Sequence, residues 1–164
     1  MTAEAAPAPQ RATSLSIPAA TPAPIATVTP APTSTSAPEH WVDVNRSAQI
    51  VTLYEGDQPV ASYPASLGFD SSDYGFYATA IGTYYVYDKY AGLNWTDWGH
   101  AWIRDWAGFD PARQNGFHTY SMDASGHVLP DGDGPTGGCV ALAPAAADQL
   151  FAFVSVGTRV EVHW

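Results

Sequence analysis

The chain has very little cysteine and few positively charged residues. Cys139 is the single cysteine among 164 residues, which excludes an intramolecular disulfide framework and is compatible with any compartment. Six Lys and Arg against 16 Asp and Glu give a formal net charge of −10. The sequence therefore offers no basic patch to neutralise phosphates, so we expect no nucleic acid and no anionic lipid surface as partner. A cationic group such as an amine is favoured instead.

Long apolar runs are missing as well. No stretch approaches the roughly 20 apolar residues that span a bilayer. The segment beginning Met1-Thr2-Ala3-Glu4 opens with an acid, and the apolar run Leu15 to Ile17 is too short for the core of a signal peptide. We therefore expect no export signal within the printed residues.

Aromatic residues are absent from residues 1–39, of which thirty are Ala, Pro, Thr or Ser. Such a segment cannot bury enough apolar surface to offset the entropy lost on ordering. We predict a disordered, Pro-stiffened arm over 1–39. All 21 aromatic residues lie between Trp41 and Trp164, and residues 40–164 are enough for one compact domain.

The hydrophobic pattern of this domain is mainly that of strands. Alternating apolar and polar residues predict β structure over His40 to Tyr54, Val60 to Ser66, Gly82 to Tyr90, Phe117 to Met122 and Arg159 to Trp164. Residues 91–117 have no clean period and are expected to be loops with short strands, and 123–138 a long loop. Pro144 suits the first turn of a helix that Gly157 ends. The sequence thus predicts a mainly β domain with one late helix.

The surroundings of Cys139 suggest chemistry. It ends the run Thr136-Gly137-Gly138-Cys139, and His118 lies upstream with seventeen residues between it and Thr136. A thiol becomes a nucleophile when a base takes its proton, and histidine is the usual base near neutral pH. Adjacent glycines let backbone N–H groups approach a developing oxyanion. These residues alone leave two interpretations open, a catalytic thiol or a small buried apolar side chain.

Four segments in order carry a resemblance that favours the catalytic interpretation. They are Val42-Asp43-Val44 with Ile50 to Gly56, Thr79 to Tyr84, the run from His118 to Cys139, and Gly157 to Val162. Together they resemble the L,D-transpeptidase catalytic domain of the YkuD type over nearly all of residues 41–164. That family has Ser or Thr, then His-Gly-Cys, downstream of a histidine at this spacing. Gly137 replaces the second histidine and Ala141 an Arg or Asn, which bears on substrate preference and rate more than on reaction type.

The resemblance implies a β-sandwich or barrel and a peptidoglycan L,D-transpeptidase. Cys139 would attack the carbonyl of the third residue of a tetrapeptide stem, and His118 would take the thiol proton and later protonate the departing D-alanine. An amine of a neighbouring stem would then accept the acyl group, giving a 3→3 cross-link. The residues implied to hold the oxyanion or position the loop are Gly138, Gly137, Thr136 and Thr119.

The same resemblance implies no cofactor and no metal. It implies peptidoglycan stem peptides as partners, carbapenem-type β-lactams as covalent inhibitors, a monomer, and a location outside the cytoplasm, in the cell wall or periplasm. Two alternatives remain open: an L,D-carboxypeptidase with water as acceptor, and a catalytically silent wall-binding module.

An aromatic set is a candidate substrate groove. Its members are Tyr84, Tyr85, Tyr87, Tyr90, Trp95, Trp98, Trp102 and Trp106. Most are expected in the core, and we predict that Tyr84, Trp102 and the neighbouring His100 touch substrate. His127 and the run Asp131-Gly132-Asp133-Gly134 are expected to form turns, because the latter lacks the spaced ligands of a calcium loop.

Overall fold

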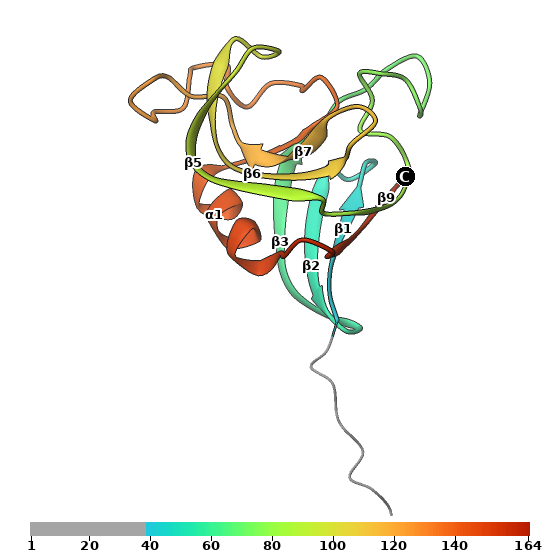
Figure 1. Cartoon of the computed structure of the whole chain (residues 1–164). Coiled ribbons are helices and arrows are strands. Elements are labelled where there is room, and N and C mark those ends of the chain that lie inside the picture. Colours follow the sequence, from blue (N-terminus) through green and yellow to red (C-terminus); the bar gives the residue numbers. More distant parts are fainter. Residues whose placement is uncertain (1–38) are drawn as a thin grey trace, which may run out of the picture. The chain divides into compact units, whose positions relative to one another are not determined.

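The structure, a computed structural model, describes residues 39–164 (Figure 1). The disordered arm predicted for residues 1–39 lies outside the described residues except for Glu39. The elements are β1 (His40–Asn45), β2 (Ile50–Glu55), β3 (Gln58–Ser66), β4 (Gly82–Tyr85), β5 (Asp88–Thr96), β6 (Ala101–Asp110), β7 (Asn115–Thr119), β8 (Val140–Leu142), α1 (Pro144–Phe153) and β9 (Arg159–His163). The prediction of a mainly β domain with one late helix is confirmed over this part of the chain.

The nine strands form one curled sheet in the order β4-β9-β1-β2-β3-β8-β7-β6-β5. The first half follows the alternation expected from the sequence. Val42 and Val44 of β1 are fully buried, as are Val51 of β2 and Val160 of β9. Their polar neighbours along each strand point away from the core, as a sheet with one buried face requires.

Helix α1 packs against β6, β7 and β8. It buries Ala146, Ala147 and Leu150 against the core and begins at Pro144, as predicted. It ends at Phe153, before Gly157, because the chain becomes extended at Val154. The carbonyls freed at this end accept bonds from Lys89 Nζ of β5, at 2.7 Å from Phe151 O and 2.6 Å from Val154 O. Lys89 thus ties the helix end to the far edge of the sheet. The described residues contain no helix of the length and apolarity needed to cross a bilayer.

The prediction of loops with short strands over 91–117 is wrong, because the strands there are long. β5 continues to Thr96, and β6 is a ten-residue strand. A bulge interrupts the alternation of apolar and polar residues that would have revealed these two strands, since the register shifts between Tyr90 and Leu93. Gly92 and Asp105 have φ values of 83° and 58° there, and Gly92 N–H donates to Asp105 Oδ1 at 3.1 Å. An extra residue in one strand breaks the two-residue period.

β7 and β8 are parallel neighbours, so the chain must cross over between them. The crossover, residues 120–139, contains no helix. It is fixed by backbone bonds from Ser121 N–H to Gly132 O and from Leu129 N–H to Ser121 O, both 2.9 Å. The loop expected over 123–138 is therefore present and held in place by bonds to its own start.

Candidate active site

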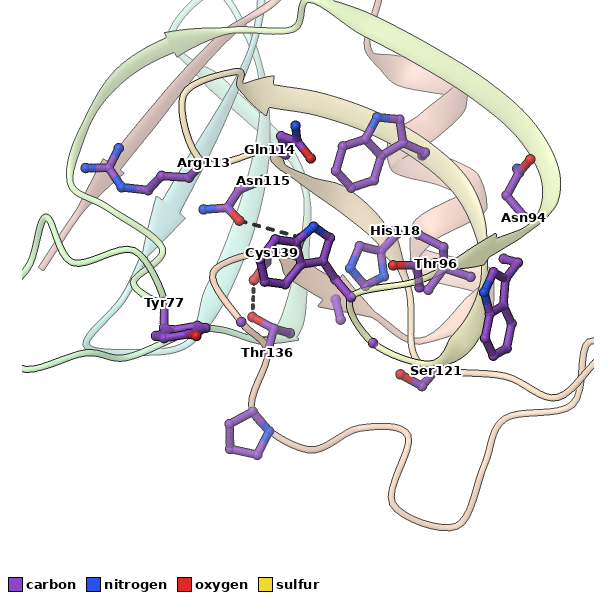
Figure 2. A pocket seen from close by; sticks show the side chains of 18 of the residues that line it. Tyr77, Asn94, Thr96, Arg113, Gln114, Asn115, His118, Ser121, Thr136 and Cys139 are labelled. Atoms are coloured by element: carbon purple, nitrogen blue, oxygen red, sulfur yellow. Dashed lines mark hydrogen bonds between the residues drawn. The ribbon is translucent and has the colours of Figure 1, made fainter.

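Cys139 and His118 face the same side of two adjacent strands. Phe117 of β7 pairs with Val140 of β8, which places Cys139 level with Gly116. Side chains alternate along a strand, so Cys139 and His118 share one face. Phe117 and Val140 point the other way, into the core. The parallel pairing therefore brings together the two residues that the sequence singled out (Figure 2).

A cavity of about 810 Å³ opens over this face. Three segments distant in sequence surround it: the loop at Phe76 and Tyr77, the turn at Trp98, and the crossover at Ser121 and 131–137. Figure 1 shows these segments at one end of the domain. Across the opening, the Phe76 and Trp98 rings lie 5.5 Å apart between centroids. The cavity is wide enough for a peptide-sized ligand.

His118 is held as a neutral base. Its Nδ1 lies 2.6 Å from Thr119 O. A carbonyl only accepts, so Nδ1 carries the proton and the neutral ring leaves Nε2 free to take one. Burial lowers the pKa of His118, because it disfavours the imidazolium. Thr119 itself is fully buried, and its Oγ1 accepts the Arg104 N–H at 2.9 Å.

Trp106 of β6 covers the His118 ring. The two rings stack with centroids 6.1 Å apart and planes 18° from parallel. Trp106 Nε1 donates to Asp88 Oδ1 at 2.9 Å, which fixes the indole. A Cβ on Gly116 would lie 2.8 Å from the indole ring, so only glycine leaves room for it there. Trp106, Gly116 and Asp88 thus hold the His118 imidazole in one orientation.

Cys139 is a protonated thiol in this state. Its Sγ donates to Asn115 Oδ1 at 3.8 Å, within range for a sulfur hydrogen bond (Figure 2). Burial raises the pKa of Cys139 to about 11, partly offset by the backbone N–H of Gly116. The Cys139–His118 pair is thus neutral near pH 7, and the proton must move when substrate reacts.

The loop before Cys139 is held by two threonines. Thr136 Oγ1 donates to Cys139 O at 2.5 Å and accepts Gly138 N–H at 3.2 Å. Thr79 Oγ1 donates to Gly138 O at 2.9 Å and accepts Gly68 N–H at 2.9 Å. Gly138 has φ 119°, a conformation that favours glycine. The backbone is therefore fixed on both sides of the thiol, and Gly138 N–H already has a partner in Thr136.

A family model for the YkuD L,D-transpeptidase catalytic domain matches residues 39–162. The chain belongs to this family. No curated protein matches it.

Solved structures agree on the fold. An L,D-transpeptidase from Stackebrandtia nassauensis is 20% identical, with a TM-score of 0.59, covering 81% of this chain and 61% of that one. One from Mycobacterium smegmatis is 17% identical, with a TM-score of 0.62, covering 77% and 59%. L,D-transpeptidase LdtMt1 in complex with imipenem is 20% identical, with a TM-score of 0.60, covering 77% and 59%. The chain thus spans about three fifths of the length of these proteins.

The two departures from the family's motif lie at the cavity. Gly137 is exposed, and a Cβ there would meet only Tyr77, at 3.8 Å. A side chain at 137 is therefore sterically tolerated. Ala141 pairs with His118 across the two strands and is buried. Both positions line the cavity, so the small residues enlarge it beside the thiol.

Of the described residues that line the cavity, none is Tyr84, Trp102 or His100. Tyr84 donates from its hydroxyl to Ala80 O at 3.0 Å and packs on the core. Trp102 packs edge-on against Trp95, with centroids 5.8 Å apart. His100 is exposed in a turn. The members of the aromatic set that do line this cavity are Tyr87, Tyr90, Trp95, Trp98 and Trp106.

Sequence reasoning also missed Asn115 and Asp88. Asn115 begins β7 and Asp88 begins β5, and both line the cavity. The only signal for Asn115 was its position three residues before His118 in a stretch expected to be loop. Elsewhere, His127 is exposed and directly follows the turn at residues 123–126, with its N–H donating to Asp123 Oδ1 at 3.0 Å. Within residues 39–164, no three His, Cys, Asp or Glu side chains are placed to hold a metal ion.

Proposed function

We propose that the protein is a peptidoglycan L,D-transpeptidase that works through a Cys139 thioester. The observation that carries the proposal is the base: His118 has its Nδ1 proton committed to Thr119 O and its ring on the same strand face as the thiol. A wall-binding module has no use for a buried, oriented imidazole beside a cysteine. The family assignment and the cavity over this face support the same reading.

The reaction follows from these groups. His118 Nε2 takes the Cys139 proton as the sulfur attacks the carbonyl of the third stem residue. The tetrahedral intermediate collapses when the bond to D-alanine breaks, and the imidazolium gives its proton to the leaving amine. The Cys139 N–H holds the oxyanion, joined by Gly138 N–H when Thr136 Oγ1 releases it. Losing one such donor costs on the order of a hundredfold in rate.

An amine is the acceptor that the cavity favours. Asp88 and Asp131 line it, whereas the lining guanidinium of Arg113 is occupied by Asp110 Oδ2 at 3.0 Å and Tyr74 O at 2.8 Å. The remaining charge is negative and attracts an ammonium group. We therefore propose cross-linking to a neighbouring stem amine, with hydrolysis by water as the competing outcome. With such a substrate, we also propose a location outside the cytoplasm, in the wall or periplasm.

The first test is the intact mass of the protein after incubation with a carbapenem. We expect one covalent adduct, none with Cys139→Ala, and D-alanine release from tetrapeptide stems by the unmodified protein only. Folded protein without adduct or D-alanine release would favour the binding module.

A second measurement identifies the acceptor. Tetrapeptide stems are incubated with and without a second stem that carries a free side-chain amine. A cross-linked dimer supports transpeptidation, and tripeptide alone in both reactions assigns a carboxypeptidase.

A further inference from the structure

Asn115 is buried against the thiol of Cys139. Only 3% of Asn115 is exposed, and its Oδ1 accepts the Cys139 thiol proton at a distance of 3.8 Å between the heavy atoms. In the view of Figure 2, Asn115 and His118 lie on opposite sides of Cys139. The thiol therefore has two candidate acceptors, a neutral amide oxygen and the free nitrogen of an imidazole.

The orientation of the Asn115 amide is fixed by its surroundings. Nδ2 donates to Ala78 O at 3.4 Å, and turning the amide over would set two oxygens against each other there. The backbone of Gly138 closes the other side. A Cβ at Gly138 would lie 2.6 Å from Nδ2 and 2.7 Å from Oδ1 of Asn115. The oxygen thus faces the sulfur, because Nδ2 is committed to Ala78 O.

This arrangement favours the thiol over the thiolate. A hydrogen bond to the neutral form of an acid holds its proton, and the negative end of an amide dipole repels the charged form. We propose that Asn115 is a positioning residue that holds Cys139 as an unreactive thiol until substrate redirects the sulfur toward His118. The inference rests on the proposed function in taking His118 as the productive base.

When the Cys139 thiol leaves Asn115, its proton passes to His118. The S–H bond of Cys139 breaks and an N–H bond forms at His118 Nε2, leaving a thiolate and an imidazolium whose Nδ1–H still donates to Thr119 O. The substrate carbonyl takes up the thiolate charge as the S–C bond forms. Between turnovers the sulfur stays protonated, and general alkylating reagents, which need thiolate, react slowly.

The test is the pH dependence of Cys139 alkylation by iodoacetamide, read by intact mass. In Asn115→Ala the acceptor is lost and water can enter, so we expect the midpoint to fall by about one pH unit and the rate at pH 8 to rise about tenfold. In Asn115→Asp a like charge faces the sulfur, and the midpoint should rise. A packing residue without an electrostatic role would not shift the two variants in opposite directions.

Two further variants make the result decisive. Asn115→Ser shortens the side chain while keeping a polar group, and should shift in the same direction as Asn115→Ala if that variant does not fold. Asn45→Asp adds the same charge at the end of β1, where the side-chain oxygen that accepts Ala48 N–H is kept. It should leave the midpoint unchanged. Unchanged midpoints in all Asn115 variants, or shifts of one sign, would overturn the proposal.

Alkylation needs no substrate, so the two proposals fail separately. Opposite shifts without any D-alanine release would leave the restraint on Cys139 standing and reject the transpeptidase. D-Alanine release by the unmodified protein, with alkylation midpoints that are the same in all Asn115 variants, would support the transpeptidase and reject the restraint on Cys139.

Discussion

The floor and the rim of the cavity are built in opposite ways. The floor is β7 and β8, whose residues from Asn115 to Thr119 and from Val140 to Leu142 are all buried. The rim is aromatic and exposed to solvent: Trp98 is 71% exposed and Tyr77 is 56% exposed. Groups that transfer protons need fixed geometry and low dielectric, which strands supply, whereas groups that bind a flexible peptide need surface. Changes to the floor should therefore alter chemical rates, and changes to the rim should alter affinity.

The largest effect on the floor is expected from His118→Ala. Removing a general base usually costs about two to four orders of magnitude in rate, and we expect this loss in carbapenem acylation, measured by stopped-flow or by mass. His127→Ala is the matched control, because His127 is exposed and does not line the cavity. Equal losses in both variants would contradict the assignment of the base.

The substitution Gly116→Ala should test whether the packing of Trp106 on His118 matters for the reaction rate. In Gly116→Ala the new Cβ meets the Trp106 indole and Ala107 O, each 2.8 Å away. Trp106 must then move off the His118 ring, so we expect acylation to slow by roughly ten- to a hundredfold and stability to fall by about 1–3 kcal/mol. In Gly126→Ala the Cβ meets nothing within 4 Å, but the φ of 79° strains any side chain, so this variant should lose stability without slowing acylation. Acylation at the unmodified rate in Gly116→Ala would show that the stacking does not orient the base.

The buried thiol also predicts how stability depends on pH. The folded pKa of Cys139 is about 11 against an ordinary 9.0, so the native state keeps its proton longer than the unfolded chain. This contribution is complete below pH 9 and is lost as the pH rises through 11. It amounts to about 2–3 kcal/mol. Urea unfolding at pH 8 and pH 11 should show that the unmodified protein loses this much more than Cys139→Ala. Identical losses in the two proteins would show that the thiol is not desolvated.

The smallest effect is expected on the rim. Trp98→Ala removes an exposed ring that contacts Phe76 across the opening. Aromatic contacts of this kind are worth about 0.5–1.5 kcal/mol, so KM for a tetrapeptide stem should rise about two- to tenfold with kcat nearly unchanged. Tyr85→Ala, an exposed aromatic on β4 that does not line the cavity, should alter neither constant. A fall in kcat with KM unchanged would show that Trp98 affects the chemical step and not substrate binding.

The sequence predicted the floor better than the rim. In the floor, Cys139 and His118 were singled out by a motif and by a family resemblance over most of the domain. Outside the floor, the valines of β1 and β9 follow from simple alternation. Tyr90 and Trp95 both line the cavity although they stand five positions apart in β5, an odd spacing that a regular strand assigns to opposite faces. The bulge between Tyr90 and Leu93 reverses that assignment. A pattern with a period of two does not locate the extra residue, so the sequence did not show that Tyr90 and Trp95 share a face.

The parallel pairing of β7 with β8 also has a consequence for the order of folding. Antiparallel neighbours such as β1 and β2 can zip from a short turn, but β8 reaches β7 only after residues 120–139 have closed a loop. Contacts across longer separations form more slowly, because the closure entropy must be overcome first. Cys139 and His118 should thus meet late, after the β1–β2–β3 meander is formed. The rate of carbapenem acylation during refolding would then report when β8 pairs with β7.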